Sequence, residues 1–192
     1  MTQSDGIKWN AHARVLKYDQ ETVDRLTREL GHEPSGAELR ALGTPYEVSE
    51  AVGNLLTTAG LARITNLITG GGGAAFNNAQ AIVGVGSSAT AAAVGDTALG
   101  GNGSTSTAYY QGADATYPST ANGVITCYAT FATGNANFAW NEWCFAVGTG
   151  TITPGGTLAS VATSPVLLNH RVQSLGTKSS GAWTLQATIT LS

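Results

Sequence analysis

Residue types that could perform catalysis are few in this sequence and lie far apart. Its histidines are His12, His32 and His170. None stands at metal-ligand spacing from a second histidine, a cysteine or a carboxylate, so the sequence predicts no metal site and no cofactor. A thiol nucleophile with a histidine base could be built from Cys127 or Cys144 with His170. Both cysteines lie in strand-like stretches, and residues 1–10 show no signal-peptide pattern, so we expect buried free thiols. A disulfide across two paired strands is the alternative.

Other catalytic patterns are equally incomplete. Hydrolysis by paired carboxylates would need Asp114 and Glu142 to face one cleft, although each is isolated in the sequence. The glycines at 70–73 lack the Lys-Ser/Thr that follows a phosphate-binding loop, and a hinge explains them better. We therefore expect a protein that is not an enzyme. A hydrolase that uses Cys144 or Glu142 is the alternative.

Two tryptophans stand close together in one strand-like stretch. Trp140 and Trp143 are three residues apart, so on a regular strand they point to opposite faces. One would fill the core and the other would face outward, either as a subunit contact or as a platform for a sugar. Polar side chains that could complete a sugar site lie nearby: Asn135, Asn137, Asn141 and Glu142. We favour the subunit contact, and predict Tyr110, Tyr128 and Trp143 as inter-subunit residues.

Charge is distributed very unevenly along the chain. Of the 21 charged side chains, 16 lie within the first 63 of 192 residues, and charged residues make up only 11% of the sequence. A typical globular protein has about 25%. So little charge suits a surface that neighbouring copies cover. The net charge of −3 without a basic run argues against a nucleic-acid partner, and the absence of a long apolar run argues against a membrane span.

The N-terminal third is predicted to be an arm followed by a helical module, together about residues 1–70. Residues 1–18 show no consistent period and resemble an extended arm, which is either a disordered terminus or a segment that lies on a partner. In the second case Trp9, Val15 and Tyr18 are its expected contacts with the partner. Asp19 predicts the start of a helix that runs to about residue 30 before Gly31.

Further helix signals follow. Ser35 and Glu38 form a capping box for a short helix, and Thr44-Pro45 predicts the start of a third. Residues 48–57 fit either a helix or a strand. Residues 58–69 carry one apolar stripe and predict a helix.

After the glycines at 70–73 the hydrophobic period changes to two. Strands are expected at about 79–85, from 109, and at 124–133, 138–147, 165–173 and 183–191. In the last of these, the apolar residues alternate with polar ones: Trp183, Leu185, Ala187, Ile189 and Leu191. One buried and one polar face are typical of antiparallel sheets. The sequence thus predicts a mainly β protein, with an antiparallel β-sandwich or jelly-roll-like domain over about 74–192.

Three stretches of the sequence resemble a known group of proteins. They are residues 137–143 (NFAWNEW), 167–178 (LLNHRVQSLGTK) and 53–61 (GNLLTTAGL). Together they resemble small structural proteins from the virions of tailed bacteriophages, over about residues 48–192. The resemblance implies a capsid decoration protein, a head fibre or a minor tail protein, commonly a homotrimeric β-sandwich or barrel held to the shell by an arm or helical module.

These observations lead to one expected function. The chain is expected to be made in the bacterial host cytoplasm and to bind the outside of a phage capsid, where it stabilises or decorates the head. Its expected partners are two further copies in a homotrimer and the major capsid protein or another virion protein. The alternative is a minor tail or fibre protein whose β domain binds a glycan or receptor.

Overall fold

The computed structural model describes residues 9–191, and the side chains of residues 9–190. Residues 1–8, which belong to the predicted arm, and the side chain of Leu191 lie outside the described residues.

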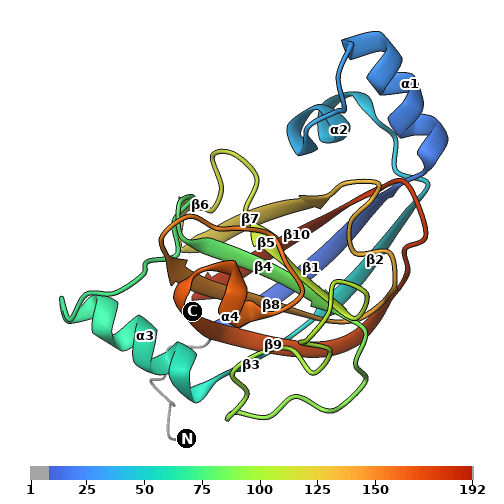
Figure 1. Ribbon diagram of the computed structural model, residues 1–192. Helices are drawn as coiled ribbons and strands as arrows, with labels where there is room; N and C mark the ends of the chain where they lie inside the picture. Colours follow the sequence, from blue (N-terminus) through green and yellow to red (C-terminus); the bar gives the residue numbers. More distant parts are fainter. Residues whose placement is uncertain (1–8, 192) are drawn as a thin grey trace, which may run out of the picture.

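Two antiparallel five-stranded sheets pack face to face, as the sequence predicts (Figure 1). The first sheet has the order β2-β1-β10-β7-β6, with these bounds: β1 Trp9–Tyr18, β2 Glu47–Val52, β6 Ser119–Ala121, β7 Val124–Phe131 and β10 Ala182–Leu191. The second has the order β3-β9-β8-β4-β5: β3 Leu55–Leu56, β4 Ala81–Gly86, β5 Ala108–Gly112, β8 Ala139–Thr149 and β9 Thr163–Thr177. The protein is therefore mainly β, with a sandwich-like architecture.

The core between the sheets follows from strand alternation. In β10, the inward side chains are Trp183, Leu185, Ala187 and Ile189, as predicted, and all are buried. The neighbouring β7 contributes Cys127, Ala129 and Phe131 in the same way. Because each apolar side chain alternates with a polar one, pairing the two strands places a continuous apolar surface on one face.

A second, smaller core lies on the other face of the second sheet. It contains Ile82, Tyr110, Cys144 and Ala146 from the sheet, and Leu99, Leu158 and Val161 from the segments that cover it. The short helix α4 (Leu158–Val161) belongs to this cover. The middle of β8 is consequently buried on both faces, which explains why its sequence does not alternate.

The predicted N-terminal arm is wrong for the described residues, because residues 9–18 form β1 in the middle of the first sheet. This strand pairs with β10 from Trp9↔Leu191 to Tyr18↔Ala182, and with β2 on its other side. Its inward residues include Ala11, Ala13 and Val15. Two alanines make a weak hydrophobic signal, so the sequence of this strand shows no clear alternation. With β2 and β3 also preceding residue 70, the N-terminal third supplies part of both sheets.

The predicted helices are confirmed where the structure shows an N-cap hydrogen bond. Helix α1 (Gln20–Leu30) begins after Asp19, which accepts a hydrogen bond from the Thr22 amide, and ends before Gly31. Helix α2 (Gly36–Leu42) has the predicted capping box, and α3 (Thr58–Ile68) matches its predicted range. The helix predicted from Thr44-Pro45 is wrong, since the chain enters β2 there, and residues 48–57 resolve into β2 and β3.

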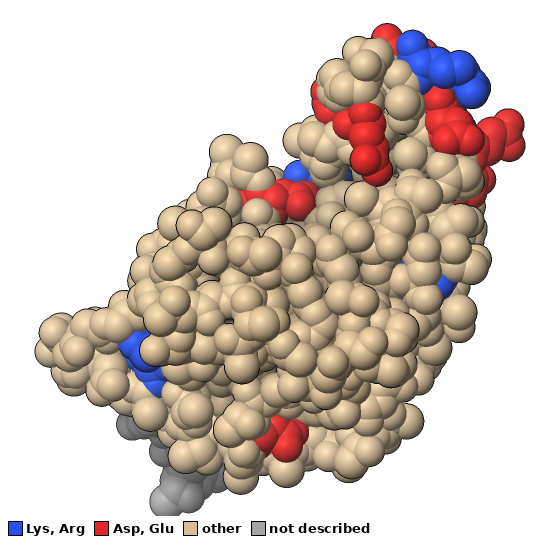
Figure 2. Space-filling model, viewed as in Figure 1, with Lys and Arg blue, Asp and Glu red and all other residues tan. Residues whose placement is uncertain are grey.

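The helices occupy opposite ends of the sandwich. Helices α1 and α2 form a hairpin at one end, and α3 projects at the other (Figure 1). Leu26 and Leu39 of the hairpin pack with Tyr18 on the outer face of the first sheet. Lys, Arg, Asp and Glu gather over the α1–α2 end, while the visible side of the β body carries few of them (Figure 2).

Candidate functional site

Most residues predicted to contact partners are buried inside the chain. Four of the six are at most 1% exposed: Val15, Tyr18, Tyr110 and Trp143. Their large apolar side chains fill the cores of the sandwich and the seat of the helical hairpin. These four predictions are wrong, because a side chain packed in the core of its own chain has no surface left for another protein.

The expected outward tryptophan is also absent, since Trp140 and Trp143 are both buried in the core between the sheets. The register of β8 against β9 shifts between Trp140 and Glu142, and this shift interrupts the alternation on which the prediction depended. Trp140 donates its Nε1 hydrogen to the Ala136 carbonyl at 2.9 Å and packs edge-on against Trp183. The two tryptophans therefore do not form a platform for a sugar.

Tyr128, another predicted contact, lies half-buried on the outer face of the first sheet. The Arg40 guanidinium of α2 stands 4.1 Å from the centroid of its ring, and Tyr117 packs edge-on against it. Arg40 also forms an ion pair of 2.6 Å with Asp114. Tyr128 thus helps to seat the helical hairpin rather than standing alone on the surface.

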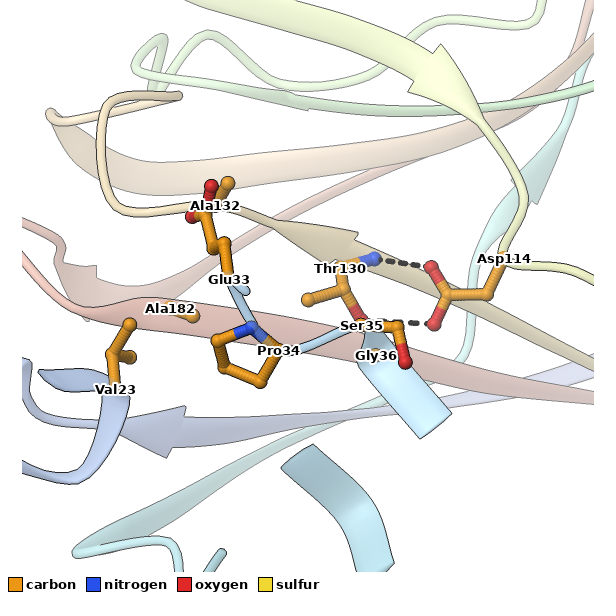
Figure 3. A pocket seen from close by; sticks show the side chains of 9 residues that line it. All are labelled: Val23, Glu33, Pro34, Ser35, Gly36, Asp114, Thr130, Ala132 and Ala182. Atoms are coloured by element: carbon orange, nitrogen blue, oxygen red, sulfur yellow. Dashed lines mark hydrogen bonds between the residues drawn. The ribbon is translucent and has the colours of Figure 1, made fainter. Parts of the chain in front are cut away.

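A cavity of about 240 Å³ lies where the helical hairpin packs on the protein, between α1, α2 and the first sheet (Figure 3). Asp114 points toward β7 in this view and accepts hydrogen bonds of 2.8 Å from both the amide and the Oγ1 of Thr130. A Cβ at Gly36 would collide with the Asp114 carboxylate and the Thr130 hydroxyl, so glycine is needed for this close approach. The cavity is therefore part of a docking joint between helix and sheet.

A buried ionic cluster joins β8, β9 and the segment 87–107. His170 lies between two carboxylates, with Nδ1 at 2.7 Å from Asp96 Oδ2 and Nε2 at 2.8 Å from Glu142 Oε2. Glu142 is fully buried and also accepts the amide hydrogens of Gly100 at 2.8 Å and Gly101 at 2.7 Å. These contacts attach the segment 87–107 to the second sheet.

The electrostatics of this cluster favour a protonated imidazole. Burial by itself would lower the pKa of His170, but the hydrogen bonds and charges of Glu142 and Asp96 outweigh it and raise the pKa. Burial would likewise raise the pKa of Glu142, but His170 and the two glycine amides together lower it. An imidazolium with both nitrogens donating has no lone pair with which to accept a proton. His170 is therefore a structural cross-link.

The other catalytic pairs considered from the sequence are not assembled. Burial raises the pKa of the Cys144 thiol well above its usual value, and His170 offers it no free nitrogen, so this pair does not form a nucleophile and base. Both cysteines are free and buried, as predicted. Asp114 and Glu142 belong to separate hydrogen-bond networks.

Sequence reasoning missed the ionic cluster, although one signal pointed to it. Three of the five charged residues beyond residue 63 lie close together in space, either in the cluster or directly beside it in β9: Asp96, Glu142 and Arg171. In a β body with so little charge, a retained charge is expected to have a partner. The partner was His170, which the charge count leaves out.

Beside the cluster, a groove of about 480 Å³ follows the edge of β9. It is lined by Asn54, Leu55, Ala89, Ala91, Ala92, His170, Arg171 and Val172. Arg171 makes no ion pair with any described residue. The groove therefore combines a positive charge with small apolar walls.

An apolar surface lies at the α3 end of the sandwich. Thr57 caps α3 and donates a hydrogen bond of 2.6 Å to the Leu167 carbonyl, and Gly60 lets the first turn press against β9. Beyond that turn the helix exposes large side chains, among them Leu61 at 52% and Ile68 at 75%.

A pocket of about 220 Å³ adjoins these side chains, and its lining is apolar except for Arg63. We call the exposed side chains and the main apolar residues of this lining together the α3 surface: Trp9, Leu61, Ile64, Leu67, Ile68, Phe76 and Val94. Trp9, a predicted partner contact, is half-buried here.

Two further properties describe residues 9–191. Within them, no group of three or more His, Cys, Asp or Glu side chains is arranged to hold a metal ion. No helix in this part of the chain is long and apolar enough to cross a membrane.

Comparison with protein-family models, with curated proteins and with solved structures finds no match to this chain. The likeness to small virion proteins of tailed phages accordingly rests on the three stretches of sequence quoted above. A functional proposal for this chain depends on the geometry of the α3 surface, the helical hairpin and the β9 groove.

Proposed function

We propose that this chain is a non-enzymatic structural protein of a phage virion, which binds the outer shell of the head as a homotrimer and decorates or stabilises it. The observation that carries the proposal is the α3 surface, an apolar surface on a β body with very few charges. The sequence resemblance supports the same class of protein.

The physical argument begins with the cost of exposing apolar area. Single exposed apolar side chains are normal, but a group of them around an apolar pocket marks a site of association. Each Å² of apolar area removed from water contributes roughly 25 cal/mol to the free energy of association. Covering the α3 surface therefore supplies part of the free energy that holds two subunits together.

The same surface offers both halves of a contact between identical copies. Leu61 and Val94 protrude near the start of α3, while Ile64, Leu67 and Phe76 line the pocket further along. When one surface carries both a protrusion and a hollow, copies related by a closed rotation can fill each other's hollows. A second copy of this chain is therefore the occupant that we assign to the α3 surface.

The charged α1–α2 end remains for water or for a charged partner such as the shell. In a closed oligomer, several copies of a weak shell contact act together, so the assembled ring binds much more tightly than one chain. An apolar end for contacts between copies and a charged end for contact with the shell together suit a decoration protein.

The oligomeric state tests the proposal first. Light scattering of the full chain at micromolar concentration should give a mass of about three times 19.5 kDa. The variant Leu61→Asp/Ile68→Asp should be a folded monomer. Leu42→Asp, which changes an equally exposed leucine at the α2 end, is the matched control and should stay assembled.

Shell binding is a separate readout. The wild-type chain should cosediment with purified heads of the phage that encodes it, and the monomeric variant should cosediment poorly. A wild-type monomer at this concentration contradicts self-assembly, and a trimer that leaves the heads unbound contradicts decoration.

A second candidate, a tail or fibre protein that binds a glycan, is favoured by one observation. A polar hollow of about 480 Å³ is lined by Thr105, Ser106, Tyr109, Gly134, Asn135, Ala136, Asn137 and Pro154. An aromatic ring beside amides and hydroxyls suits a sugar better than the buried tryptophans do. Binding on a glycan array that Tyr109→Ala abolishes, with the mass in solution unchanged, would establish this function instead.

A further inference from the structure

The groove beside β9 lies where the second sheet loses its edge strand. β3 pairs with β9 only at Leu55↔His170 and Leu56↔Asn169. From Arg171 onward β9 has no ladder partner on that side among the described strands, although β2 lies beside it and Gln173 Nε2 donates a hydrogen bond of 3.0 Å to the Glu50 carbonyl. The ladder on this side of β9 therefore ends at His170, next to the groove.

Several polar atoms at this groove are shielded from solvent without a hydrogen-bond partner among the described residues. They are Nδ2 and Oδ1 of Asn54 and Nε of Arg171. Arg171 uses one Nη2 hydrogen on Gln173 Oε1 at 3.0 Å, and its remaining donors have no carboxylate. Shielded polar groups without partners destabilise a fold, so their clustering in one groove points to a ligand that completes them.

Neither carboxylate on this side of the sheet forms an ion pair with Arg171. Asp96 and Glu142 both bind His170, each at a separate ring nitrogen. Small apolar side chains also line the groove, among them Ala89, Ala91 and Ala92. The groove therefore combines an uncompensated positive charge with small apolar side chains.

We propose that this groove binds an extended acidic segment of a partner protein. A carboxylate of the segment pairs with the Arg171 guanidinium, which suits planar, bidentate recognition. The Asn54 amide offers a donor to a peptide carbonyl and an acceptor to a peptide N–H of the same segment. The inference rests on the proposed function only for the source of the segment, another protein of the particle.

Asn54 has both an unpaired donor and an unpaired acceptor, and this combination favours a peptide over a simple anion. Phosphate or acetate could accept hydrogen bonds from Arg171 and from Asn54 Nδ2, but neither brings an N–H to Asn54 Oδ1. A peptide brings both groups at each residue.

The test uses the full chain and two synthetic peptides in isothermal titration calorimetry. The probe is the acetylated and amidated pentapeptide Thr-Val-Asp-Val-Thr, and its partner carries Asn in place of Asp. The Asp peptide should bind saturably, and about tenfold or more tightly than the Asn peptide. Arg171→Gln should remove this preference, and Asn54→Ala should weaken both peptides.

Arg28→Gln is the matched control, because Arg28 is an exposed arginine in the last turn of α1, at the other end of the molecule. This variant should bind both peptides as the wild type does. A thermal melt confirms that each variant is folded, and Asn54→Ala tests the groove if Arg171→Gln does not fold.

Three results would overturn the inference: no saturable binding of the Asp peptide, equal binding of the two peptides, or unchanged binding by Arg171→Gln. Sodium acetate that competes as well as the Asp peptide would overturn the peptide class. A trimer that binds heads but not the peptide contradicts this inference alone. A peptide-binding chain that neither assembles nor binds heads contradicts the proposed function alone.

Discussion

Glu142 and His170 are joined by a hydrogen bond of 2.8 Å between Oε2 and Nε2 inside the second sheet. They lie on adjacent strands, and Asp96 holds the other nitrogen of the same ring. A surface loop is thereby fastened to the sheet by charge rather than by apolar packing alone. The stability of the fold should therefore depend on pH.

The pH dependence has a defined window. The pKa of His170 is raised above its ordinary 6.5, so its stabilisation is complete below pH 6.5 and is lost as pH rises through the folded value. Glu142 and Asp96 have lowered pKa values, so their stabilisation is complete above their ordinary 4.5 and 3.8 and is lost as pH falls through the folded values. Urea unfolding should show the largest contribution between about pH 4.5 and 6.5.

His170→Gln should flatten the alkaline side of this profile. His32→Gln changes an exposed histidine in the turn between α1 and α2 and should leave the profile unchanged. The same decline above pH 6.5 in His170→Gln would show that another group is responsible.

Removing the carboxylate of Glu142 should destabilise the fold strongly. Glu142→Ala leaves the His170 charge and the amides of Gly100 and Gly101 without an acceptor in a buried site. Breaking a buried ion pair in this way costs about 3–5 kcal/mol of the free energy of unfolding. Glu29→Ala, at an exposed position of α1, is the control and should change it by less than about 1 kcal/mol. Chemical denaturation distinguishes the two, and equal effects would contradict the role of the cluster.

The strand assignment of residues 9–18 predicts a sharp effect of truncation. Deleting residues 1–18 removes β1 from between β2 and β10, so the product should not fold. Val15→Ala should cost about 2 kcal/mol because the side chain is fully buried, whereas Val52→Ala on the exposed side of β2 should cost little. Circular dichroism and thermal melts measure both. A folded, cooperative truncation product would contradict the strand and restore the arm.

The seat of the helical hairpin depends on a glycine. A Cβ at Gly36 meets the Asp114 carboxylate and the Thr130 hydroxyl, so Gly36→Ala should push α2 away and weaken the pair between Arg40 and Asp114. The expected cost is about 1–3 kcal/mol. Gly95→Ala is the control, since an added Cβ there meets nothing. Increased proteolysis within α1 and α2 in Gly36→Ala would locate the effect, and protection equal to the wild type would refute it.

Local signals in the sequence determined the capped helices and the strands that alternate. Asp19 before α1, the Ser35 and Glu38 box of α2, and the alternation of β7 and β10 each depend on residues a few positions apart. Such signals act through the chain's own turns and pleats, so they survive without knowledge of the fold.

Tertiary structure alone decided where β1 lies, how Trp140 and Trp143 point, and which charges meet. β1 is a strand because β10, at the far end of the chain, pairs with all of it. The tryptophans share one core because the register against β9 shifts. His170 meets Glu142 across 28 positions and Asp96 across 74, a distance over which no local period carries information. The cluster and the groove beside it therefore exist only once the second sheet has closed.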